Sequence, residues 1–570
     1  MRADNYSANE QASINCWLLL QPSNRMEWRS PASKGSAHRS SRSTSAGRWI
    51  FLLLLLSFLS YASLLLVWSR DSLSTPPNRT PLRSENGTQL IQVKALPMAD
   101  PKERTFRCIG WRAAMDCTPF GPRDPSRDLP CSRTVYNSDA GYCEVEDTRT
   151  GEHFRVMRRH CTGIPHAARF RCDDALAFVD FRKKARKAVE KALVPGFALP
   201  NVVMDGGEQP KDGVIIVVYP KQVASAYALI RTLRKVLKCK LPIELWYCPQ
   251  ELYGFPGPLT PLKHLVDSDS TITFHKIEDT RAMGFGAKVF SIYNSLLDRV
   301  LFLDADNFPV RDPSSLFDSP EFETTGAVFW PDYWHPENTI FNIHVKSMLW
   351  ELLDTPFVDM FEQESGQLLI DRRRHAAPMK LAFFYMFHRP NFFNKLKVAH
   401  GDKDLFRFAW LKLEAPFHMV QTPPAVGGKV INDMFCGMTM AQHDLEGNVL
   451  FLHRNQFKLT GKPAGLKKRE APEVDGLPDP VIWTHLLSFN RSYETEHYVI
   501  DTYRAQPAFP KSQSCFGKRK LGNDPHFTSQ NFSTMSFADL ENTIRQFSVD
   551  AVGLLPATHN VDTIRLRLAE

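Results

Sequence analysis

The sequence predicts an α/β fold with a parallel sheet that is buried on both faces. Short apolar runs rich in β-branched residues recur between residues 213 and 303, helical patterns separate them, and the connections are short. Such β-α-β alternation is typical of parallel strands joined by crossovers. Strands are expected at 214–219, 243–247, 271–274 and 300–303, and helices at 224–237 and 290–297.

The strand at 300–303 runs directly into Asp304-Ala305-Asp306, and residues 307–313 then break the apolar pattern. Both carboxylates therefore lie where a buried strand ends, which is the edge of an α/β sheet that binds ligands. Two such carboxylates can share Mn²⁺ or Mg²⁺, and Mg²⁺ typically adds substrate phosphates to its protein ligands. The pattern predicts a metal-bound diphosphate. A solvated acidic loop is the alternative, whereas a D-x-D-x-T phosphatase is not supported because residue 308 is Phe.

Residues 49–68 form an uncharged apolar run that is long enough to cross a bilayer. Residues 1–48 are polar, rich in Ser and Arg, and are expected to be a disordered tail. Their excess of basic residues places this tail in the cytosol, and the run starts too far from Met1 for a usual signal peptide. We therefore expect a single-pass type II protein with a lumenal stem at 69–100. A buried core helix is the alternative for the apolar run.

A dense group of cysteines follows the stem, in a module expected at 101–175. Six of the 11 cysteines lie there: Cys108, Cys117, Cys131, Cys143, Cys161 and Cys172. An even, dense set beyond a membrane anchor predicts disulfides, for which about fifteen connectivities remain open. Zinc is the alternative, but no C-x-x-C pair occurs there. The glycosylation sequons at Asn78, Asn86, Asn490 and Asn531 all fall on the expected lumenal side.

The remaining chain is expected to form an amphipathic helix at 174–193, an α/β domain at 205–470 and a C-terminal extension at 471–570. No G-x-G-x-x-G follows the first strand of the domain, so a dinucleotide site is not expected. The net charge of +8 is spread along the chain without a dense Lys/Arg stripe, which argues against a nucleic-acid partner.

Residues 300–317 read VLFLDADNFPVRDPSSLF, which is more specific than the D-x-D alone. This segment resembles the fungal Golgi α-mannosyltransferases that build mannan side branches with α-1,2 and α-1,3 linkages. That family belongs to the nucleotide-diphospho-sugar transferases with the GT-A fold. The E-S-G-Q at 364–367, followed by arginines at 372–374, also resembles the family. The resemblance covers roughly residues 210–465, and neither the cysteine module nor the tail from about 470 matches it.

The resemblance implies a Rossmann-like GT-A domain and roles for several side chains. A late histidine completes the metal shell in many such enzymes, and His453 is the best-placed candidate, with His443 as its rival. The residues implied in catalysis are Asp304, Asp306, Gln367, Asp402 and Asp404. Those implied in donor binding are Tyr219, Lys288, Asp304, Ala305, Asp306, Glu364, Gly366, Gln367 and Lys458.

Several of these assignments have a structural alternative. Lys288 could be a solvated lysine instead of a phosphate ligand. The segment 364–367 could be an acidic turn instead of a loop beneath the donor sugar. Asp402 could be an N-cap, because it precedes a helix expected at 405–410. His453 could be a core or surface histidine.

Aromatic side chains follow a strand expected at 326–329. Trp330, Tyr333 and Trp334 could stack on the C–H faces of a pyranose, so we assign them to acceptor binding. A place in the hydrophobic core is the alternative.

These features together predict a Golgi glycosyltransferase. The resemblance implies transfer of mannose from GDP-mannose to a mannose-bearing glycan, with Mn²⁺ or Mg²⁺ and retention of the α configuration, and a place in a glycosyltransferase complex is compatible with it. One alternative is the same fold with a UDP-sugar, such as UDP-galactose or UDP-N-acetylglucosamine. The other is a non-catalytic lumenal glycan-binding protein or partner subunit. Asp304, Asp306 and His453 argue against it, because an inactive chain need not keep them.

The topology can be tested in intact microsomes. Added protease should remove only the N-terminal tail, because the charge bias places residues 1–48 in the cytosol. Glycosidase should lower the mass of the protected fragment if the lumenal sequons are used. A protease-protected N-terminus would contradict the type II orientation.

Overall fold

The computed structural model describes residues 93–96, 104–136, 138–165, 168–202, 209–252, 257–462, 475–505 and 514–556. The expected tail, the apolar run at 49–68, most of the stem, Asn78 and Asn86 lie outside these ranges. Within them, no helix combines the length and apolarity needed to cross a membrane. The chain divides into one unit at Met1–Ile91 and a second at Gln92–Glu570, and the following concerns the second.

The first sheet has seven strands in the order β14-β12-β13-β10-β7-β8-β9. Their bounds are β7 Asp212–Val218, β8 Ile243–Tyr247, β9 Ile272–Lys276, β10 Arg299–Asp304, β12 Ala327–Pro331, β13 Gln363–Asp371 and β14 His418–Met419. β10, β7, β8 and β9 are parallel, which confirms the expected alternation, whereas β13 runs antiparallel to both β10 and β12. The sheet is therefore mixed: β14 is parallel to β12, and within this sheet β13 runs opposite to its two neighbours.

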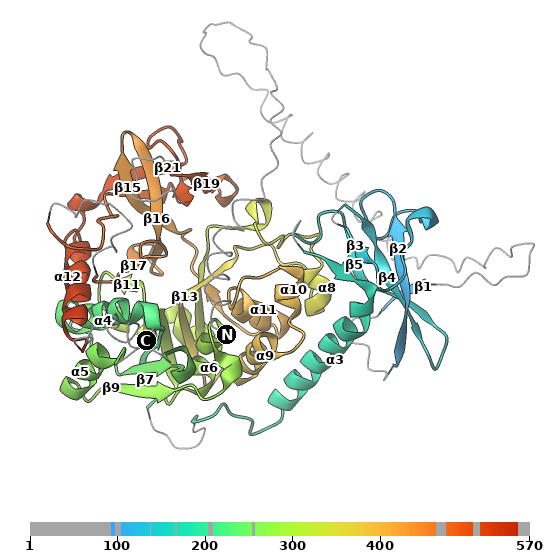
Figure 1. Cartoon of the computed structure of the whole chain (residues 1–570), viewed down its shortest axis with the longest axis horizontal. Coiled ribbons are helices and arrows are strands. Elements are labelled where there is room, and N and C mark those ends of the chain that lie inside the picture. Colours follow the sequence, from blue (N-terminus) through green and yellow to red (C-terminus); the bar gives the residue numbers. More distant parts are fainter. Residues whose placement is uncertain are drawn as a thin grey trace, which may run out of the picture. The chain divides into compact units, whose positions relative to one another are not determined.

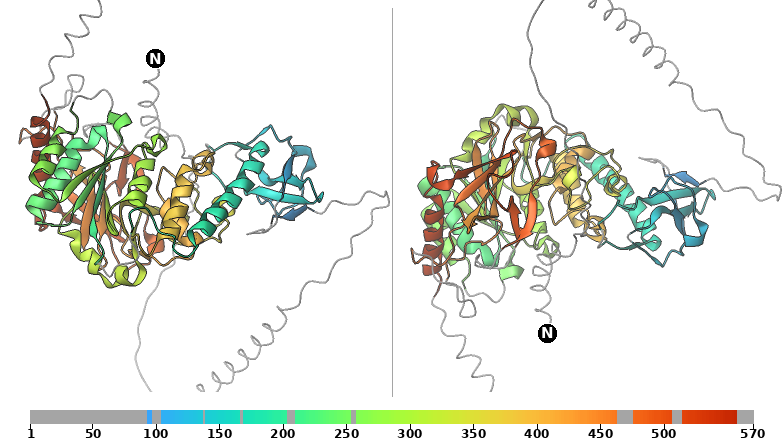
Figure 2. Two further views of the ribbon diagram at one scale, coloured as in Figure 1. Left: turned by 90° about the horizontal axis from the view of Figure 1, so that it is seen from below. Right: turned by 90° about the horizontal axis from the view of Figure 1, so that it is seen from above.

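Alternate residues of the central strands pack into two different cores, as a strand buried on both faces requires. Ile215 and Phe302 face α6, α9 and α11, whereas Ile216 and Leu301 face α4, α5, α12 and a second sheet (Figures 1 and 2). These helices are α4 Val223–Arg231, α5 Thr260–Ser268, α6 Gly286–Asn294, α9 Ala376–Phe387, α11 Leu405–Lys412 and α12 Leu540–Gly553. The helix expected at 224–237 ends in a π-turn at Thr232–Val236, and the one expected at 290–297 begins earlier, at Gly286.

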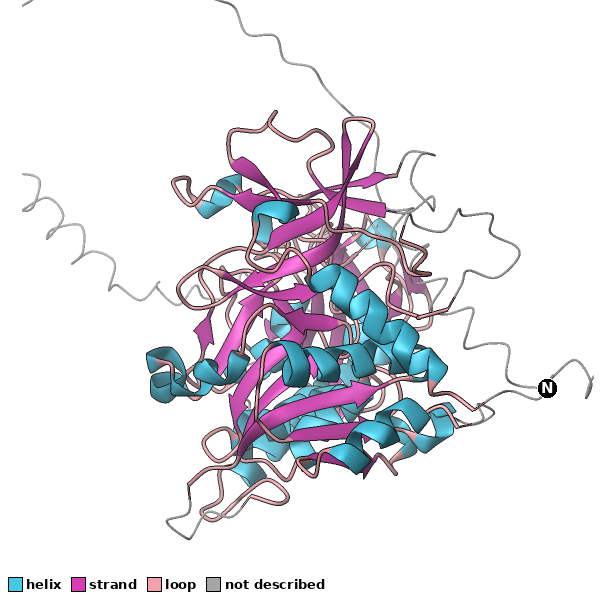
Figure 3. Cartoon of the chain, turned by 90° about the vertical axis from the view of Figure 1, so that its left-hand side faces the viewer, coloured by secondary structure: helices cyan, strands magenta, loops and turns pink. Residues whose placement is uncertain are grey.

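The second sheet has eight strands, of which β11-β17-β16-β15-β18-β21 form the main order and β20 joins β16 to β19. Figure 3 shows strands (magenta) in the upper part of the view and most helices (cyan) in the lower part. Their bounds are β11 Asn307–Pro309, β15 Ala425–Ile431, β16 Met434–His443, β17 Val449–His453, β18 His485–Phe489, β19 Asp501–Arg504, β20 Ser514–Gly517 and β21 Phe527–Asn531. The segment expected as a C-terminal extension thus supplies four strands of this sheet and α12, which packs against α4. It forms part of the same compact unit.

Two buried links hold this C-terminal segment in place. A disulfide that the sequence did not predict joins Cys436 on β16 to Cys515 on β20. Arg454, directly after β17, donates from Nη1 to Glu541 Oε1 at 2.6 Å, and both side chains are buried. Glu541 also accepts from the backbone N–H groups of Ile482 and Trp483, so both of its carboxylate oxygens are hydrogen-bonded inside the protein.

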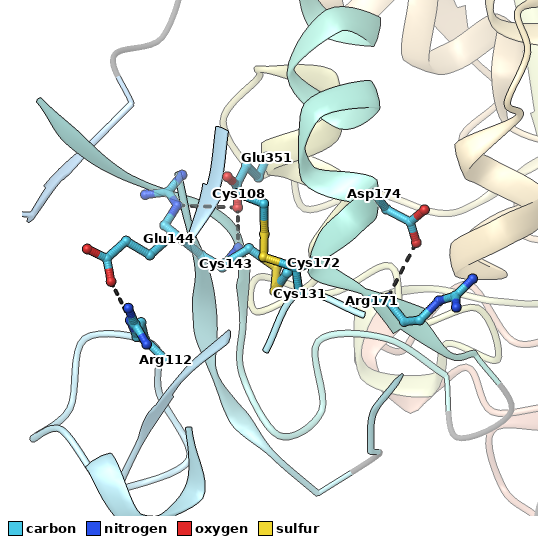
Figure 4. The surroundings of a disulfide bond; sticks show 10 residues. Cys108, Arg112, Cys131, Cys143, Glu144, Arg171, Cys172, Asp174 and Glu351 are labelled. Carbon is cyan, nitrogen blue, oxygen red and sulfur yellow. Dashed lines mark hydrogen bonds and ion pairs between the residues drawn. A yellow bond between two sulfur atoms is a disulfide. The ribbon is translucent and has the colours of Figure 1, made fainter. Parts of the chain in front are cut away.

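The cysteine module is a four-stranded sheet, β1-β5-β4-β2, with a small β3-β6 pair beside it. Its elements are β1 Val93–Ala95, β2 Phe106–Ala114, β3 Thr134–Val135, β4 Ala140–Asp147, β5 His153–Arg159 and β6 Phe170–Arg171, followed by α3 Ala175–Ala192. The expected disulfide framework is confirmed, with pairs Cys108–Cys131, Cys117–Cys161 and Cys143–Cys172. Figure 4 shows Cys108, Cys131, Cys143 and Cys172 beside the start of α3.

Helix α3 fixes the module against the α/β domain. Phe178 and Phe181 pack edge-on against Phe392 of α10 (Phe392–Leu396), and α3 also contacts α9 and α8 (Leu349–Leu353). Arg182 pairs with Asp354 at 2.5 Å at the same interface. The remaining helix, α7, spans Pro320–Thr325. The apolar core of the module is continuous with that of one face of the first sheet.

The disulfide between Cys436 and Cys515 closes a loop with a sequence separation of 79. Replacing both cysteines by Ala should lower the free energy of unfolding by about 2–5 kcal/mol, mainly because the unfolded chain gains freedom. Chemical denaturation of the full chain measures this change in the free energy of unfolding. The matched control is Cys239→Ala, which removes a buried cysteine outside any disulfide. Equal unfolding midpoints for the two variants would show that the bridge does not constrain the C-terminal segment.

Candidate functional site

The chain passes from one sheet to the other at Asp304-Ala305-Asp306. Strand β10 ends at Asp304 in the first sheet, and β11 begins at Asn307 in the second. In the second sheet Asn307 pairs with His453, the last residue of β17. This antiparallel pairing brings a histidine that is distant in sequence beside the carboxylates.

Asp304, Asp306 and His453 form a group of three metal-ligand side chains. One ligand atom from each lies within 4.8 Å of the others. His453 Nε2 is 3.4 Å from Asp306 Oδ1, and Lys458 Nζ is 2.8 Å from Asp306 Oδ2. Two carboxylates and an imidazole are donors that suit Mn²⁺, and carboxylate oxygens suit Mg²⁺. The sequence placed these three residues in one metal shell, and the structure brings them together.

The rival histidine lies elsewhere. His443 is buried at the end of β16 and is not part of the three-residue group. Burial lowers its pKa to about 4, so the imidazole is neutral. The antiparallel register of β16 and β17 pairs His453 with Met440 instead of His443, which separates the two histidines along the sheet.

The charges of the group are strongly coupled. Burial raises the pKa of Asp304. Burial also opposes ionisation of Asp306, but Lys458 and His453 hold its pKa well below the usual range. Burial alone would lower the pKa of His453, yet the Asp306 carboxylate raises it to about 9. The site is therefore a buried cluster whose negative charges attract a cation.

Lys288 is not a solvated lysine and does not point at an open phosphate site. Its ammonium is buried and donates to Asp304 Oδ2 at 3.2 Å, to Ser365 O at 2.7 Å and to Ser365 Oγ at 3.1 Å. It also pairs with Asp402 Oδ2 at 3.1 Å. Burial disfavours its charge, but Asp304 and Asp402 hold its pKa above the usual value. The expected phosphate contact is corrected to a structural one, because its three N–H groups already face protein acceptors.

The E-S-G-Q segment is part of strand β13 instead of a loop. Its side chains alternate, and Gly366 faces His453: a Cβ at Gly366 would lie 2.6 Å from His453 Nδ1. Gln367 is fully buried and accepts from Asn307 Nδ2 at 2.6 Å. The segment was expected beneath the donor sugar, and as the strand beside β10 it forms the wall of the metal site.

The two aspartates before α11 have different surroundings. Asp402 pairs with Lys288 and is thereby linked to Asp304. Asp404 instead takes the N-cap position of α11 with φ +65°, where Oδ1 accepts from Gln363 N and Arg407 Nε. The N-cap suggested for Asp402 therefore belongs to Asp404. Asp404 is fully buried in this network, so the catalytic role that the resemblance implied for it is corrected to a structural one.

The aromatic residues expected to bind the acceptor are buried instead. Trp330 is 0% exposed and its Nε1 donates to His443 O at 2.8 Å. Tyr333 and Trp334 are each 4% exposed, and the Tyr333 hydroxyl donates to Thr439 O. The Trp330 ring packs in the core between the two sheets, whereas Tyr333 and Trp334 pack in a separate core formed with residues of the second sheet, so none offers a free face for a sugar. This assignment is corrected to the core alternative.

Tyr219 and Ala305 lie at the carboxyl edge of the sheet, as expected. Tyr219 follows β7 directly and its hydroxyl donates to Gly284 O at 3.1 Å. Its pKa is raised well above the usual value by burial and then by Asp304 and Asp402, which shows how near it is to the acidic group. Ala305 is buried between the two aspartates.

Sequence reasoning missed two contributors. Gln222 follows β7 and places Nε2 3.4 Å from Asp306 Oδ2, and Asn307 fixes Gln367. Polar residues just after a buried strand were the available signal in both cases.

A second buried group of charges, which was not predicted from the sequence, lies beside the site. Lys403 pairs with Asp332 at 3.0 Å and with Glu362. Burial raises the pKa of Asp332 to about 6. The lysine neutralises Glu362, directly before β13, and Asp332, directly after β12, so it holds these segments together.

Comparison with known proteins points to one enzyme family. Residues 211–444 match the family described as "Mannosyltransferase putative", which confirms the predicted resemblance for this segment. The α-1,2-mannosyltransferase MNN2 of Saccharomyces cerevisiae is 28% identical over 345 residues, covering 54% of this chain and 55% of that protein. The α-1,2-mannosyltransferase MNN23 of Candida albicans is 25% identical, covering 49% and 54%. The chain thus spans about half the length of these relatives.

Two solved glycosyltransferases share a similar segment. The mannosyltransferase Ktr4p of S. cerevisiae has 12% identity and a TM-score of 0.26, covering 46% of this chain and 82% of that chain. The galactosyltransferase LgtC has 12% identity and a TM-score of 0.26, covering 37% and 73%. At these scores neither structure bears on the function of this chain.

Lys288 allows a direct test of its structural role. Lys288→Met should lower the free energy of unfolding by about 3–5 kcal/mol, because it leaves buried Asp402 and partly buried Asp304 without their shared cation. Denaturant unfolding without ligand measures this effect. Lys458→Met is the matched control: Lys458 is 47% exposed, and its loss should cost at most about 1 kcal/mol. Unchanged stability in Lys288→Met would favour the phosphate-binding role instead.

Proposed function

We propose that the α/β unit is a GT-A nucleotide-diphospho-sugar transferase that moves mannose from GDP-mannose to a mannose-bearing glycan, with retention of the α configuration. The observation that carries the proposal is the convergence of Asp304, Asp306 and His453 at the junction of the two sheets. The match of residues 211–444 to a mannosyltransferase family and the α-1,2-mannosyltransferases among its relatives support mannose as the sugar.

Asp304, Asp306 and His453 would hold Mn²⁺. The donor set fits this ion, since it combines the carboxylates of Asp304 and Asp306 with one imidazole within 4.8 Å of one another. A bound divalent ion would act as a Lewis acid toward the diphosphate and favour departure of the nucleotide.

The protein's own residues prepare this site in three ways. Lys458, which is half exposed beside Asp306, is placed to reach an anion that enters from solvent. Gln222 donates toward Asp306 and orients that carboxylate. The Asn307–Gln367 hydrogen bond fixes the strand that lies beside β10, so the carboxylates stay in position when a ligand binds.

Retention of configuration requires either a carboxylate nucleophile or attack from the face of the leaving phosphate. Gln367, at the position implied by the family pattern, is an amide and cannot act as a carboxylate nucleophile. Its side-chain oxygen is already engaged by Asn307. We therefore favour attack from the face of the leaving diphosphate, with the phosphate oxygen accepting the proton of the acceptor hydroxyl.

We further propose that the enzyme lies in the Golgi lumen as a type II membrane protein. Four disulfides in the described residues suit an oxidising compartment. Asn531 is exposed at the end of β21 and Asn490 is partly exposed, so both sequons are accessible to glycosylation.

The catalytic test uses the paired aspartates. Asp304→Asn and Asp306→Asn should each lower the rate of mannose transfer on the order of a thousandfold, because the metal loses a carboxylate ligand. Transfer from GDP-mannose to a short α-mannoside is measured across a Mn²⁺ titration, with UDP-sugars as competing donors. Asp312→Asn is the control, since Asp312 caps a turn by accepting from Ser314 N and is not part of the candidate metal group. Turnover that survives both substitutions, or that ignores a chelator, would contradict the proposal.

A further inference from the structure

Glu364 and Asp306 face different nitrogens of the His453 ring. His453 Nε2 is 3.4 Å from Asp306 Oδ1, whereas His453 Nδ1 is 3.6 Å from Glu364 Oε1. The two ring nitrogens therefore face different carboxylates. One nitrogen is directed at the candidate metal position, and the other at a residue outside the group of candidate ligands.

The backbone holds Glu364 in this place. Its Oε1 accepts from the N–H of Gly366 at 2.6 Å, which fixes the carboxylate on the face of β13 toward His453. Gly366 leaves room for the ring, because a Cβ there would lie 2.6 Å from Nδ1 and 3.1 Å from Glu364 Oε1. The absence of a side chain at residue 366 therefore leaves the space on β13 that the imidazole occupies.

The Nδ1 atom lacks a closer partner. Among the described residues it makes no hydrogen bond, and the His453 side chain is only 10% exposed. A buried imidazole nitrogen without a partner is costly, and a small rotation toward Glu364 would satisfy it. Asp306 faces Nε2, so of the two carboxylates paired with this ring Glu364 is the acceptor available to Nδ1.

We propose that Glu364 is a positioning residue: its carboxylate accepts the Nδ1–H of His453 and thereby presents the Nε2 lone pair to the metal held by Asp304 and Asp306. The inference rests on the proposed metal site and deepens it. Histidines that bind metals commonly donate their other N–H to a carboxylate, which fixes the tautomer and increases the basicity of the ligand atom. Glu364, expected from the sequence to bind the donor, acts here through His453.

Mn²⁺ affinity tests the proposal without any donor or catalytic turnover. The dissociation constant of Mn²⁺ is measured on the full chain by electron paramagnetic resonance of the free ion. Glu364→Ala should weaken binding by about 10–100-fold. Glu364→Gln should retain most of the affinity, because the amide oxygen can still accept from Nδ1–H and from Gly366 N. This variant also keeps the test decisive if Glu364→Ala does not fold.

Two comparisons separate positioning from a general loss of negative charge. Asp332→Asn removes a buried acidic group that is electrostatically coupled to Glu364 but has no contact with His453, so Mn²⁺ affinity should change far less. A double-mutant cycle with His453→Ala asks whether Glu364 acts through the ring. In that background, Glu364→Ala should have little further effect.

The outcomes are distinct. Equal Mn²⁺ affinity in the wild type and Glu364→Ala would overturn the inference and leave the metal site intact. The same loss in both backgrounds would also overturn it, since Glu364 would then act on the ion directly. A wild-type chain that binds no Mn²⁺ would overturn the proposed metal site and, with it, this role for Glu364.

Discussion

The buried ammonium of Lys288 is the interaction on which the rest of the site depends. It joins α6 to Asp304 at the end of β10, to Ser365 on β13 and to Asp402 before α11. Four segments that are separate in sequence are thus tied to one cation. Without it, several carboxylates would lie close together in a low-dielectric interior, where their repulsion is strong. The lysine permits an acidic group that is dense enough to bind a divalent ion.

The second constraint is the crossing of the chain between the two sheets at Asp304-Ala305-Asp306. Because β11 pairs with β17, backbone hydrogen bonds of the second sheet place His453 beside the carboxylates. That sheet is completed by the C-terminal strands and closed by the disulfide of Cys436 and by Arg454 with Glu541. The residues beyond 475 therefore support the metal site although none of them belongs to it.

Positive and negative charges alternate through the interior around the site. Lys458 and His453 flank Asp306, Lys288 lies between Asp304 and Asp402, and Lys403 neutralises Asp332 with Glu362. Each buried ion pair costs desolvation and adds little net stability by itself. Such a network is better explained by the geometry it imposes, since each pair fixes the direction of a carboxylate near the candidate active site.

The parallel strands, the pair Asp304 and Asp306, the candidate His453 and the cysteines of the module's disulfides could all be predicted from the sequence. These features are local, because an apolar run that ends in carboxylates indicates a buried strand and its end whatever segments lie beside it. The pairing of Lys288 with aspartates, the core position of Trp330, the place of the E-S-G-Q segment on β13 and the completion of the second sheet by the C-terminal strands follow from the fold alone. Those outcomes depend on which distant segments pair, and hydrophobic periodicity specifies that a face is buried without specifying its partner.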